Sequence, residues 1–296
     1  AIKSPEHQYL YAEIEGLRLA IVKQQFSMIA AELLAYALIG AFSGVAAGLL
    51  GIGGGLIIIP FLLISFDYFA VIPFAVQAHV AVATSLATII FTALSAIYSQ
   101  QQKKAIDWSI VLLMAPGIVL GSFLGAWIAS YLPRQFLLLI FSGFVLMVGL
   151  KMWFGWSPHS RGKLPGAAGM ELVALMIGMI SAIVGIGGGT MTVPFLHWGR
   201  IVIQRAIAIS SALGLPIAVS GTLGFYMSSL SADPLQVQYL WGYVYLPAFA
   251  AIISLSVIAA PAGVYLSHKM SKQILGQVFS ILLIILAVRL LAHAVI

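Results

Sequence analysis

Charged side chains are scarce in this chain of 296 residues. Asp, Glu, Lys and Arg together make up 7% of it, whereas hydrophobic residues make up 62%. Ordinary globular domains carry roughly 25% charged residues, so a chain this poor in charge could not cover a water-exposed surface. Lipid must be the solvent for most of it. Six stretches contain no Asp, Glu, Lys or Arg: 33–66, 68–102, 108–133, 135–150, 172–199 and 273–288.

Cysteine is absent, which excludes disulfides, thiolate metal sites and cysteine nucleophiles. A membrane enzyme would need a nucleophile, a base or a metal cluster, and the motifs H-E-x-x-H and G-x-S-x-G are both missing. We therefore expect a protein that is not an enzyme and that uses no cofactor or metal. The net charge of +6 comes from bases between the apolar stretches, where they set membrane orientation, so no nucleic-acid partner is expected.

Carboxylates are missing from the middle of the apolar stretches. Ion-coupled carriers usually keep such a carboxylate as a relay, so proton coupling through one is not expected here. Glu32 and Glu171 each precede the first apolar helix of a half, and we expect them at the membrane interface. Residues 1–30 are mixed and polar, with no visible signal peptide, and 9–26 has an amphipathic pattern. An interfacial helix is the favoured interpretation of 1–30, and a disordered tail is the alternative.

An internal repeat organises the chain. GVAAGLLGIGGGLIIIPFLL at 44–63 matches GMISAIVGIGGGTMTVPFLH at 178–197, and AVATSL at 81–86 resembles AIAISS at 206–211. A third match joins Gly125, Arg134 and Lys151 to Gly263, Lys272 and Arg289. Three matches in the same order indicate a tandem duplication. The repeats are 31–155 and 167–296, joined by a polar linker at 156–166.

Both halves predict the same order of helices in an all-α polytopic membrane protein. Each has a glycine-broken helix pair followed by three fuller helices. The first half is predicted as helices at 33–50, 56–66, 75–99, 108–131 and 134–153. The second half is predicted as helices at 168–184, 190–198, 205–228, 239–267 and 272–294.

The break in each half is the motif GIGGG, at 51–55 and 185–189. Three glycines in a row favour unwound backbone, which is tolerated at membrane depth only when it is buried in protein or lines a cavity. The apolar piece at 56–66 would rise only about 17 Å at 1.5 Å per residue, about half a bilayer. Each break should therefore lie near the membrane midplane.

Two topologies remain open for these broken pairs. If each pair enters and returns, every half has three crossings and the halves are inverted. The basic residues at 103–104, 151–163, 200–205 and 269–272 then fall on one side of the membrane. If each pair crosses, the halves are parallel and these bases divide between the two sides. The positive-inside rule favours the re-entrant, inverted arrangement, which is a known plan of transporters.

A backbone anion site is the chemistry that the glycine breaks predict. The start of the second piece presents free N–H groups and the positive end of a helix dipole, and two such starts could hold an anion without a buried base. Ser85 and Ser210, in matching places, could donate hydroxyls to it. The alternatives are glycines that only permit close packing and hydroxyls bonded to their own helices. The candidate substrate-binding residues are Gly53, Gly54, Gly55, Gly187, Gly188, Gly189, Thr84, Ser85, Ser210, Ser211, Thr190 and His79.

These residues resemble those of the TauE/SafE family, also called the sulfite exporter or toluene-sulfonate uptake permease family. The chain reads GIGGGLIIIP with AVATSL in the first half, and GIGGGTMTVP with AIAISS in the second. KKAIDW at 103–108 and the G-x₃-G of Gly121 and Gly125 fit as well. The second half departs from the family pattern at Ser211, where Leu is usual, and in WGYVY at 241–245.

The resemblance implies an inner-membrane transporter of sulfur-containing anions such as sulfite, sulfoacetate or other organosulfonates, by alternating access around the two breaks. The sequence leaves open an anion channel with the same site, and a membrane sensor or scaffold that binds the anion without moving it. The expected partners are a small anionic substrate and the lipid bilayer, and a homodimer is a further option.

Overall fold

The computed structural model describes residues 5–50, 54–155, 162–231, 237–269 and 272–295, and these residues are mostly helical. The first half contains α1 (Pro5–Leu50), α2 (Gly55–Phe69), the 3₁₀ turn η1 (Phe74–Val76), α3 (Gln77–Gln102), α4 (Trp108–Tyr131) and α5 (Arg134–Trp153). The second half contains α6 (Ala167–Val184), α7 (Gly189–Trp198), α8 (Ile203–Ser229), strands β1 (Leu240–Trp241) and β2 (Val244–Tyr245), α9 (Leu246–Lys269) and α10 (Lys272–Val295).

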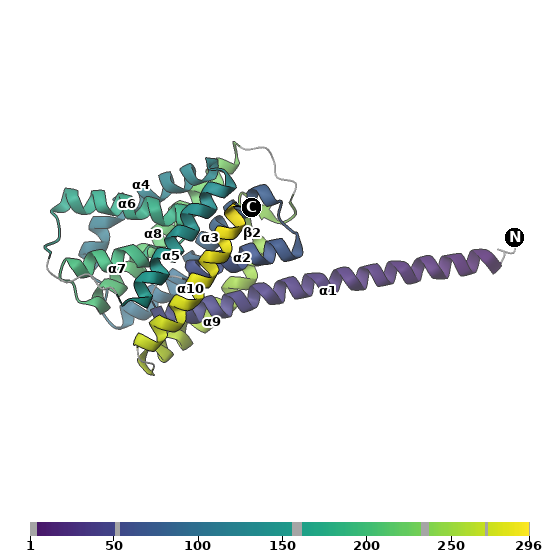
Figure 1. Cartoon of the computed structure of the whole chain (residues 1–296), viewed down its shortest axis with the longest axis horizontal. Helices are drawn as coiled ribbons and strands as arrows, with labels where there is room; N and C mark the ends of the chain where they lie inside the picture. The colour runs from purple at the N-terminus through teal and green to yellow at the C-terminus, as the bar shows by residue number, and fades with distance from the viewer. Residues whose placement is uncertain (1–4, 51–53, 156–161, 232–236, 270–271, 296) are drawn as a thin grey trace.

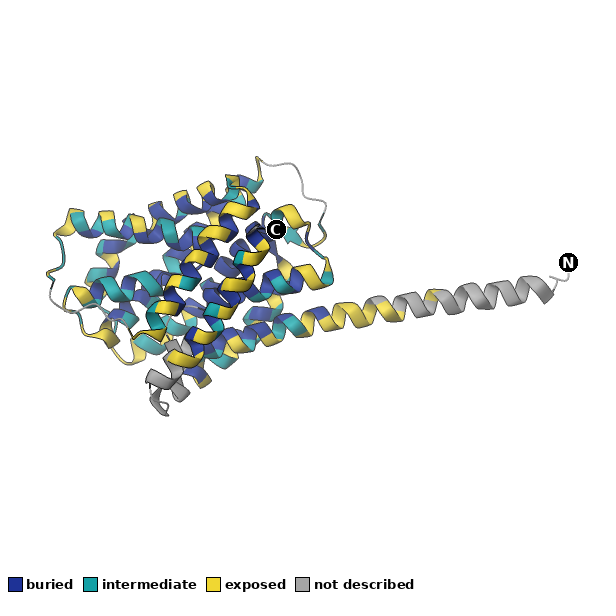
Figure 2. Ribbon diagram, in the orientation of Figure 1, coloured by how far each residue is buried: buried dark blue, intermediate teal, exposed yellow. Residues whose placement is uncertain are grey.

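Eight helical segments within the described residues are long and apolar enough to cross a membrane. The shorter helices α2 and α7, of 15 and 10 residues, begin at the last glycine of each motif, one residue before the predicted start. The chain is therefore an all-α polytopic membrane protein. Figure 2 shows the buried residues inside the bundle and exposed ones along its outer faces. Large apolar side chains cover these faces, as lipid contact requires; examples are Leu112, Leu120, Leu139, Met147, Leu223 and Ile285.

The first helix is longer than predicted. It runs unbroken from Pro5 to Leu50, and its first part projects away from the bundle (Figure 1). Because the helix continues through residue 30, the boundary predicted there is not marked by a change of secondary structure. The side chains described between Phe26 and Ala31 are all exposed, consistent with a segment outside the protein core. Its placement at the membrane interface stays a prediction.

The helix predicted at 239–267 is wrong at its start. A two-stranded antiparallel hairpin pairs Leu240 with Tyr245, and α9 begins only at Leu246. Gly242 occupies the first turn position with a φ of +59°, a left-handed conformation that favours glycine and suits a two-residue hairpin turn. The aromatic residues around Gly242 have strand propensity, which the apolar run into α9 concealed.

Helices of one half pack chiefly on helices of the other. Extensive contacts join α1 to α9, α4 to α6, and α5 to α10. Glycines permit the close approach of the first two pairs, since a Cβ on any of them would overlap backbone of the partner helix. These are Gly40 and Gly44 of α1 against Ile252 and Ser256, and Gly117, Gly121 and Gly125 of α4 against Glu171, Leu175 and Met179.

The end of α1 and the whole of α2 form an antiparallel helical hairpin. The rings of Tyr36 and Phe66 are 6.4 Å apart, and those of Phe42 and Phe61 are 6.1 Å apart. Residues later in α1 therefore contact residues earlier in α2, which shows that the two helices run antiparallel. The chain reverses direction at the first glycine motif, and both helices of the pair lie on the same side of that break.

Candidate substrate site at the paired glycine breaks

Both breaks end in a glycine with left-handed backbone. Gly54 caps the start of α2 with a φ of +71°, and Gly188, its match in the repeat, caps the start of α7 with a φ of +74°. Residues with a Cβ adopt this conformation less readily, so glycine is favoured at both positions. Gly53, the remaining candidate of the first motif, lies outside the described residues.

The two breaks meet inside the bundle. A Cβ on Gly55 would lie 2.5 Å from the carbonyl oxygen of Gly185, so only glycine allows the first motif to touch the second. The Ser85 hydroxyl donates to that same carbonyl oxygen over 3.0 Å, and its side chain is fully buried. Gly187 is also close to its neighbours, because its carbonyl oxygen would lie 3.2 Å from a Cβ on Gly214. Sites far apart in the sequence thus form one buried junction.

The start of α7 carries unused backbone donors. The amides of Met191 and Thr192 donate to the Gly188 carbonyl, which closes the first turn. The amides of Gly188, Gly189 and Thr190 donate to no acceptor among the described residues. Free amides at a helix start, together with the positive end of the helix dipole, attract anions. This is the chemistry that the sequence predicts for the breaks.

The predicted hydroxyl ligands divide into two groups. Thr84 accepts the amide of Tyr245 over 3.0 Å, and Ser211 donates to the Ile207 carbonyl of its own helix, so both already have protein partners. Ser210 and Thr190 keep buried hydroxyl oxygens without a partner among the described residues. Ser85 bridges the breaks, as described above. The role of these hydroxyls as substrate ligands stays a prediction.

His79 lies apart from the junction. It precedes Ser85 by six residues, about 9 Å along α3. Its Nε2 lies 3.0 Å from the Leu132 carbonyl oxygen, and its ring lies 5.7 Å from that of Tyr243. The imidazole is therefore engaged in packing at the first turn of α3, and the structure does not bring it to the glycine breaks.

A cluster of aromatic side chains from the β-hairpin, α1 and α2 lies beside the start of α3, and the sequence did not predict it. Tyr243 and Tyr245 of the β-hairpin are buried, and the Tyr245 ring lies 6.2 Å from Tyr36 and 5.9 Å from Phe66. The Tyr245 hydroxyl donates to Glu32 over 2.9 Å. Burial, reinforced by this carboxylate, raises the pKa of Tyr245, so the phenol keeps the proton that it donates. Glu32 is a buried residue, 8% exposed, and its predicted position at the membrane interface stays a prediction.

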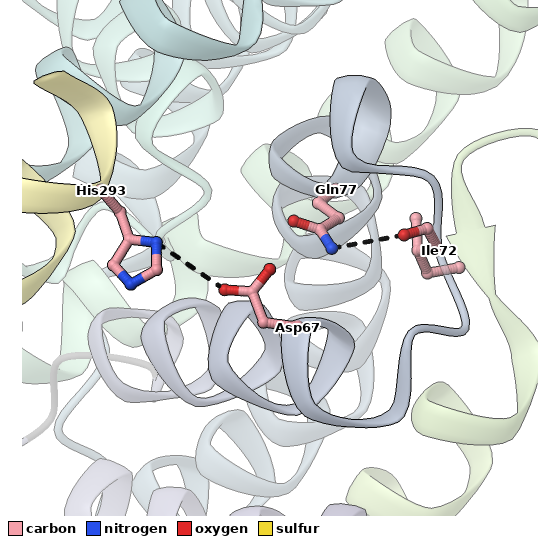
Figure 3. Close-up of polar contacts among 4 residues, drawn as sticks. All are labelled: Asp67, Ile72, Gln77 and His293. Atoms are coloured by element: carbon pink, nitrogen blue, oxygen red, sulfur yellow. Dashed lines mark hydrogen bonds and ion pairs between the residues drawn. The ribbon is translucent and has the colours of Figure 1, made fainter. Parts of the chain in front are cut away.

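The last turn of α2 and the segment that follows it are held at this same end of the bundle (Figure 3). Asp67 of α2 lies 4.0 Å from Nδ1 of His293 on α10, and the Gln77 amide donates to the Ile72 carbonyl over 3.3 Å. Both Asp67 and His293 are substantially exposed, and their contact is ionic only when His293 is protonated, so it contributes at most about 1 kcal/mol. These contacts fix the loop and lie ten or more residues from the glycine break, so they do not form part of the junction.

Two glycine-broken helices that meet inside a bundle of membrane-spanning helices are an arrangement found in membrane transporters. The sequence profile described as Sulfite exporter TauE/SafE matches residues 36–290. The chain belongs to the TauE/SafE family.

Curated relatives carry transporter names. A probable membrane transporter protein of Haemophilus influenzae is 32% identical over 254 residues, which cover 86% of this chain and 96% of the relative. One of Methanocaldococcus jannaschii is 27% identical, covering 83% and 90%. Another, of Bacillus subtilis, is 25% identical, covering 67% and 81%. No solved structure is significantly similar to the chain.

Proposed function

We propose that this family member transports small sulfur-containing anions, such as sulfite or organosulfonates, across the inner membrane of a prokaryote by alternating access around the paired glycine breaks. The observation that carries the proposal is the junction itself. Gly55, Gly185 and Ser85 hold the two breaks together inside the bundle, and the start of α7 at the second break carries free amides. A backbone site of this kind binds an oxyanion without a buried base.

The packing around this site favours a carrier over a protein that binds the anion without moving it. Helices of one half pack on helices of the other. A rigid-body movement of the α1–α2 hairpin would therefore change the contact between the first glycine break and the second. The site would then be exposed to each side in turn. Sulfite and sulfonates share the oxyanion that such a cradle recognises, and the family resemblance supplies the sulfur chemistry.

The antiparallel hairpin of α1 and α2 supports the re-entrant, inverted topology. In that arrangement the loops with Lys103 and Arg200 face the cytoplasm and the 229–238 loop faces the opposite side. Cysteine labelling would test this, since the chain offers a cysteine-free background. In intact cells, Ser231→Cys should react with a membrane-impermeant maleimide, and Lys103→Cys should react only after lysis. Reaction of both variants, or of neither, in intact cells would place the two loops on the same side and contradict the inverted arrangement.

Transport itself can be measured in proteoliposomes loaded with unlabelled sulfite. We expect saturable uptake of radiolabelled sulfite, accelerated by sulfite or a sulfonate on the opposite side, because a carrier returns faster when loaded. Sulfate and taurine serve as comparison substrates. Flux that does not saturate and shows no counterflow would identify a channel instead. Binding without flux would identify a sensor and would refute the transport of these anions.

A further inference from the structure

A carboxylate lies buried in the first membrane-spanning segment, away from the glycine breaks. Glu32 belongs to the part of α1 between Phe26 and Ala47 that is long and apolar enough to cross a membrane, and it is 8% exposed. Its Oε1 accepts the hydroxyl of Tyr245, a residue of the other half, over 2.9 Å. Ionisable side chains inside membrane spans are rare, and they commonly mark the path of a substrate or an ion. The charge of Glu32 therefore calls for a partner.

No basic side chain of the described chain supplies that partner. None of its Lys, Arg or His nitrogens lies within 4.0 Å of the Glu32 carboxylate. The bases at this end of the bundle, Arg134 and His293, lie near Asp67 of α2 instead. The helix α9 packs along α1 and carries no acid, base or histidine at 246–267. A buried charge without a partner is strongly destabilising, so a bound cation would stabilise this carboxylate.

Two buried hydroxyls beside Glu32 have no hydrogen-bond partner. The phenol of Tyr36 is 0% exposed and lies beside Glu32 and Ser65, and Ser65 is 6% exposed. Neither hydroxyl oxygen is bonded to any other group among the described residues. Leaving a buried hydroxyl unpaired is costly, so two of them at one carboxylate indicate a missing ligand. With Tyr245 they place three hydroxyl oxygens around a carboxylate, and oxygen atoms are the ligands that hard cations prefer.

The number of free groups favours a metal ion over a proton. A proton on Glu32 would supply one donor, which could satisfy Tyr36 or Ser65 but not both. A metal ion can contact both oxygens at once. A single carboxylate balances a single positive charge, and the described residues contain no group of three or more acids, histidines or cysteines that would hold a divalent ion. The site therefore suits a monovalent cation such as Na⁺.

We propose that a sodium ion binds to the Glu32 carboxylate and to the three hydroxyls beside it, and that anion transport depends on this ion. The dependence rests on the function proposed above, whereas the binding of the ion does not. The ligands lie on α1, α2 and β2, so the ion would join both arms of the first broken hairpin to the second half.

The sodium site is linked to the junction of the glycine breaks through β2. The backbone amide of Tyr245 donates to the Thr84 hydroxyl over 3.0 Å. The next residue, Ser85, donates to the Gly185 carbonyl over 3.0 Å. An ion that fixes Tyr245 against α1 and α2 would therefore also help to position Ser85 at the junction. This is the physical route by which sodium binding would affect the anion.

Sulfite uptake into proteoliposomes tests the dependence on sodium. Uptake should be about tenfold faster in sodium chloride than in choline chloride of the same ionic strength, a typical coupling between two sites. Glu32→Gln keeps the size of the side chain but removes its charge, so it should abolish the difference between the salts. Asp67→Asn removes another acid at the same end of the bundle and is the matched control, which should keep the difference. Equal wild-type uptake in both salts would overturn the dependence.

The hydroxyl ligands are tested through the sodium concentration that gives half-maximal uptake. Tyr36→Phe and Ser65→Ala should each raise it about fivefold or more, because each removes one oxygen from the ion. A purely structural role predicts the opposite, since losing an unpaired buried hydroxyl should leave the protein as stable or more stable. Tyr98→Phe removes an exposed phenol of α3 and should change nothing. Wild-type sodium concentrations in both test variants would overturn the site.

Melting temperature in detergent measures sodium binding without transport. Sodium chloride should raise it by about 2 °C or more over choline chloride at equal ionic strength. Glu32→Gln should lose this rise while eluting normally from a sizing column, and Glu32→Asp should keep part of it. Stabilisation by sodium without any sulfite flux would retain the site and refute the transport function. Saturable sulfite uptake with no effect of sodium on either measurement would do the reverse.

A proton is the competing occupant of the same carboxylate. The titratable groups that face Glu32 are Tyr36 and Tyr245, with Tyr239 beside the latter. His79, on α3, is bonded to a backbone carbonyl instead. Uptake should therefore be measured across a series of pH values at constant sodium. A pH dependence that Glu32→Gln removes, together with no effect of sodium, would assign the carboxylate to a proton and overturn the sodium site.

Discussion

Replacing Gly55 with alanine should reduce transport about 100-fold while leaving the protein folded. The backbone of Gly55 is not left-handed, so alanine can adopt its conformation. Any loss of transport would therefore come from the contacts of the added Cβ. The added Cβ would lie 2.5 Å from the Gly185 carbonyl oxygen and 3.1 Å from the Ser85 hydroxyl. Backbone cannot rotate away as a flexible side chain would, so the two breaks must separate by several tenths of an ångström or more. Misplacement of a functional site by 1 Å costs on the order of 100-fold in rate.

The stability cost of this change is smaller than its functional cost. Overpacking by one methyl group typically costs roughly 1–3 kcal/mol, which a bundle held by the α1–α9, α4–α6 and α5–α10 pairs can absorb. Sulfite uptake should be compared at equal reconstituted protein, with elution from a sizing column as the measure of folding. Gly143→Ala in α5 is the control, because a Cβ there meets nothing within 4 Å. Wild-type uptake by Gly55→Ala would mean that the junction is not where transport is controlled.

The junction could be predicted from the sequence because its parts are local. The doubled GIGGG fixed the positions of α2 and α7, and both observed helices begin within one residue of the expected start. Gly54 and Gly188 adopt the left-handed conformation that only glycine takes readily, so the motif reports backbone geometry directly. The sequence match of Ser85 with Ser210 drew attention to Ser85, which bonds to Gly185, although nothing in the sequence indicates that bond.

Features that depend on distant partners could not be predicted. Glu32 was placed at the interface because it precedes an apolar run, yet its partner Tyr245 lies 213 residues further along the chain. The hairpin that carries Tyr245 was concealed inside an apolar stretch, where a short strand and a helix have the same composition. The stacking of Phe42 on Phe279 likewise joins α1 to α10, which lie at opposite ends of the chain.

Replacing Gly121 with leucine should remove the folded protein altogether. Gly121 lies where α4 crosses α6, and even a Cβ there would overlap the backbone of Leu175. Gly117 is equally close, because its Cβ would lie 2.5 Å from the Glu171 carbonyl oxygen. Helices in lipid associate mainly by close packing, since no hydrophobic effect drives them together there. A leucine would hold the helices apart by about the width of a side chain and would forfeit contacts along their whole length.

The loss would reach the junction of the glycine breaks because α6 leads into the second glycine motif and α4 belongs to the first half. Separating them would leave α7 without a fixed position opposite Gly55, so folding and site geometry would fail together. We expect less than a tenth of the wild-type yield of monodisperse protein after extraction in mild detergent. Gly143→Leu introduces the same side chain into a spanning helix at a position with open space, and its yield should match wild type. Normal yield and melting temperature for Gly121→Leu would show that this contact does not hold α4 and α6 together. The packing of first-half helices on second-half helices would then need another cause.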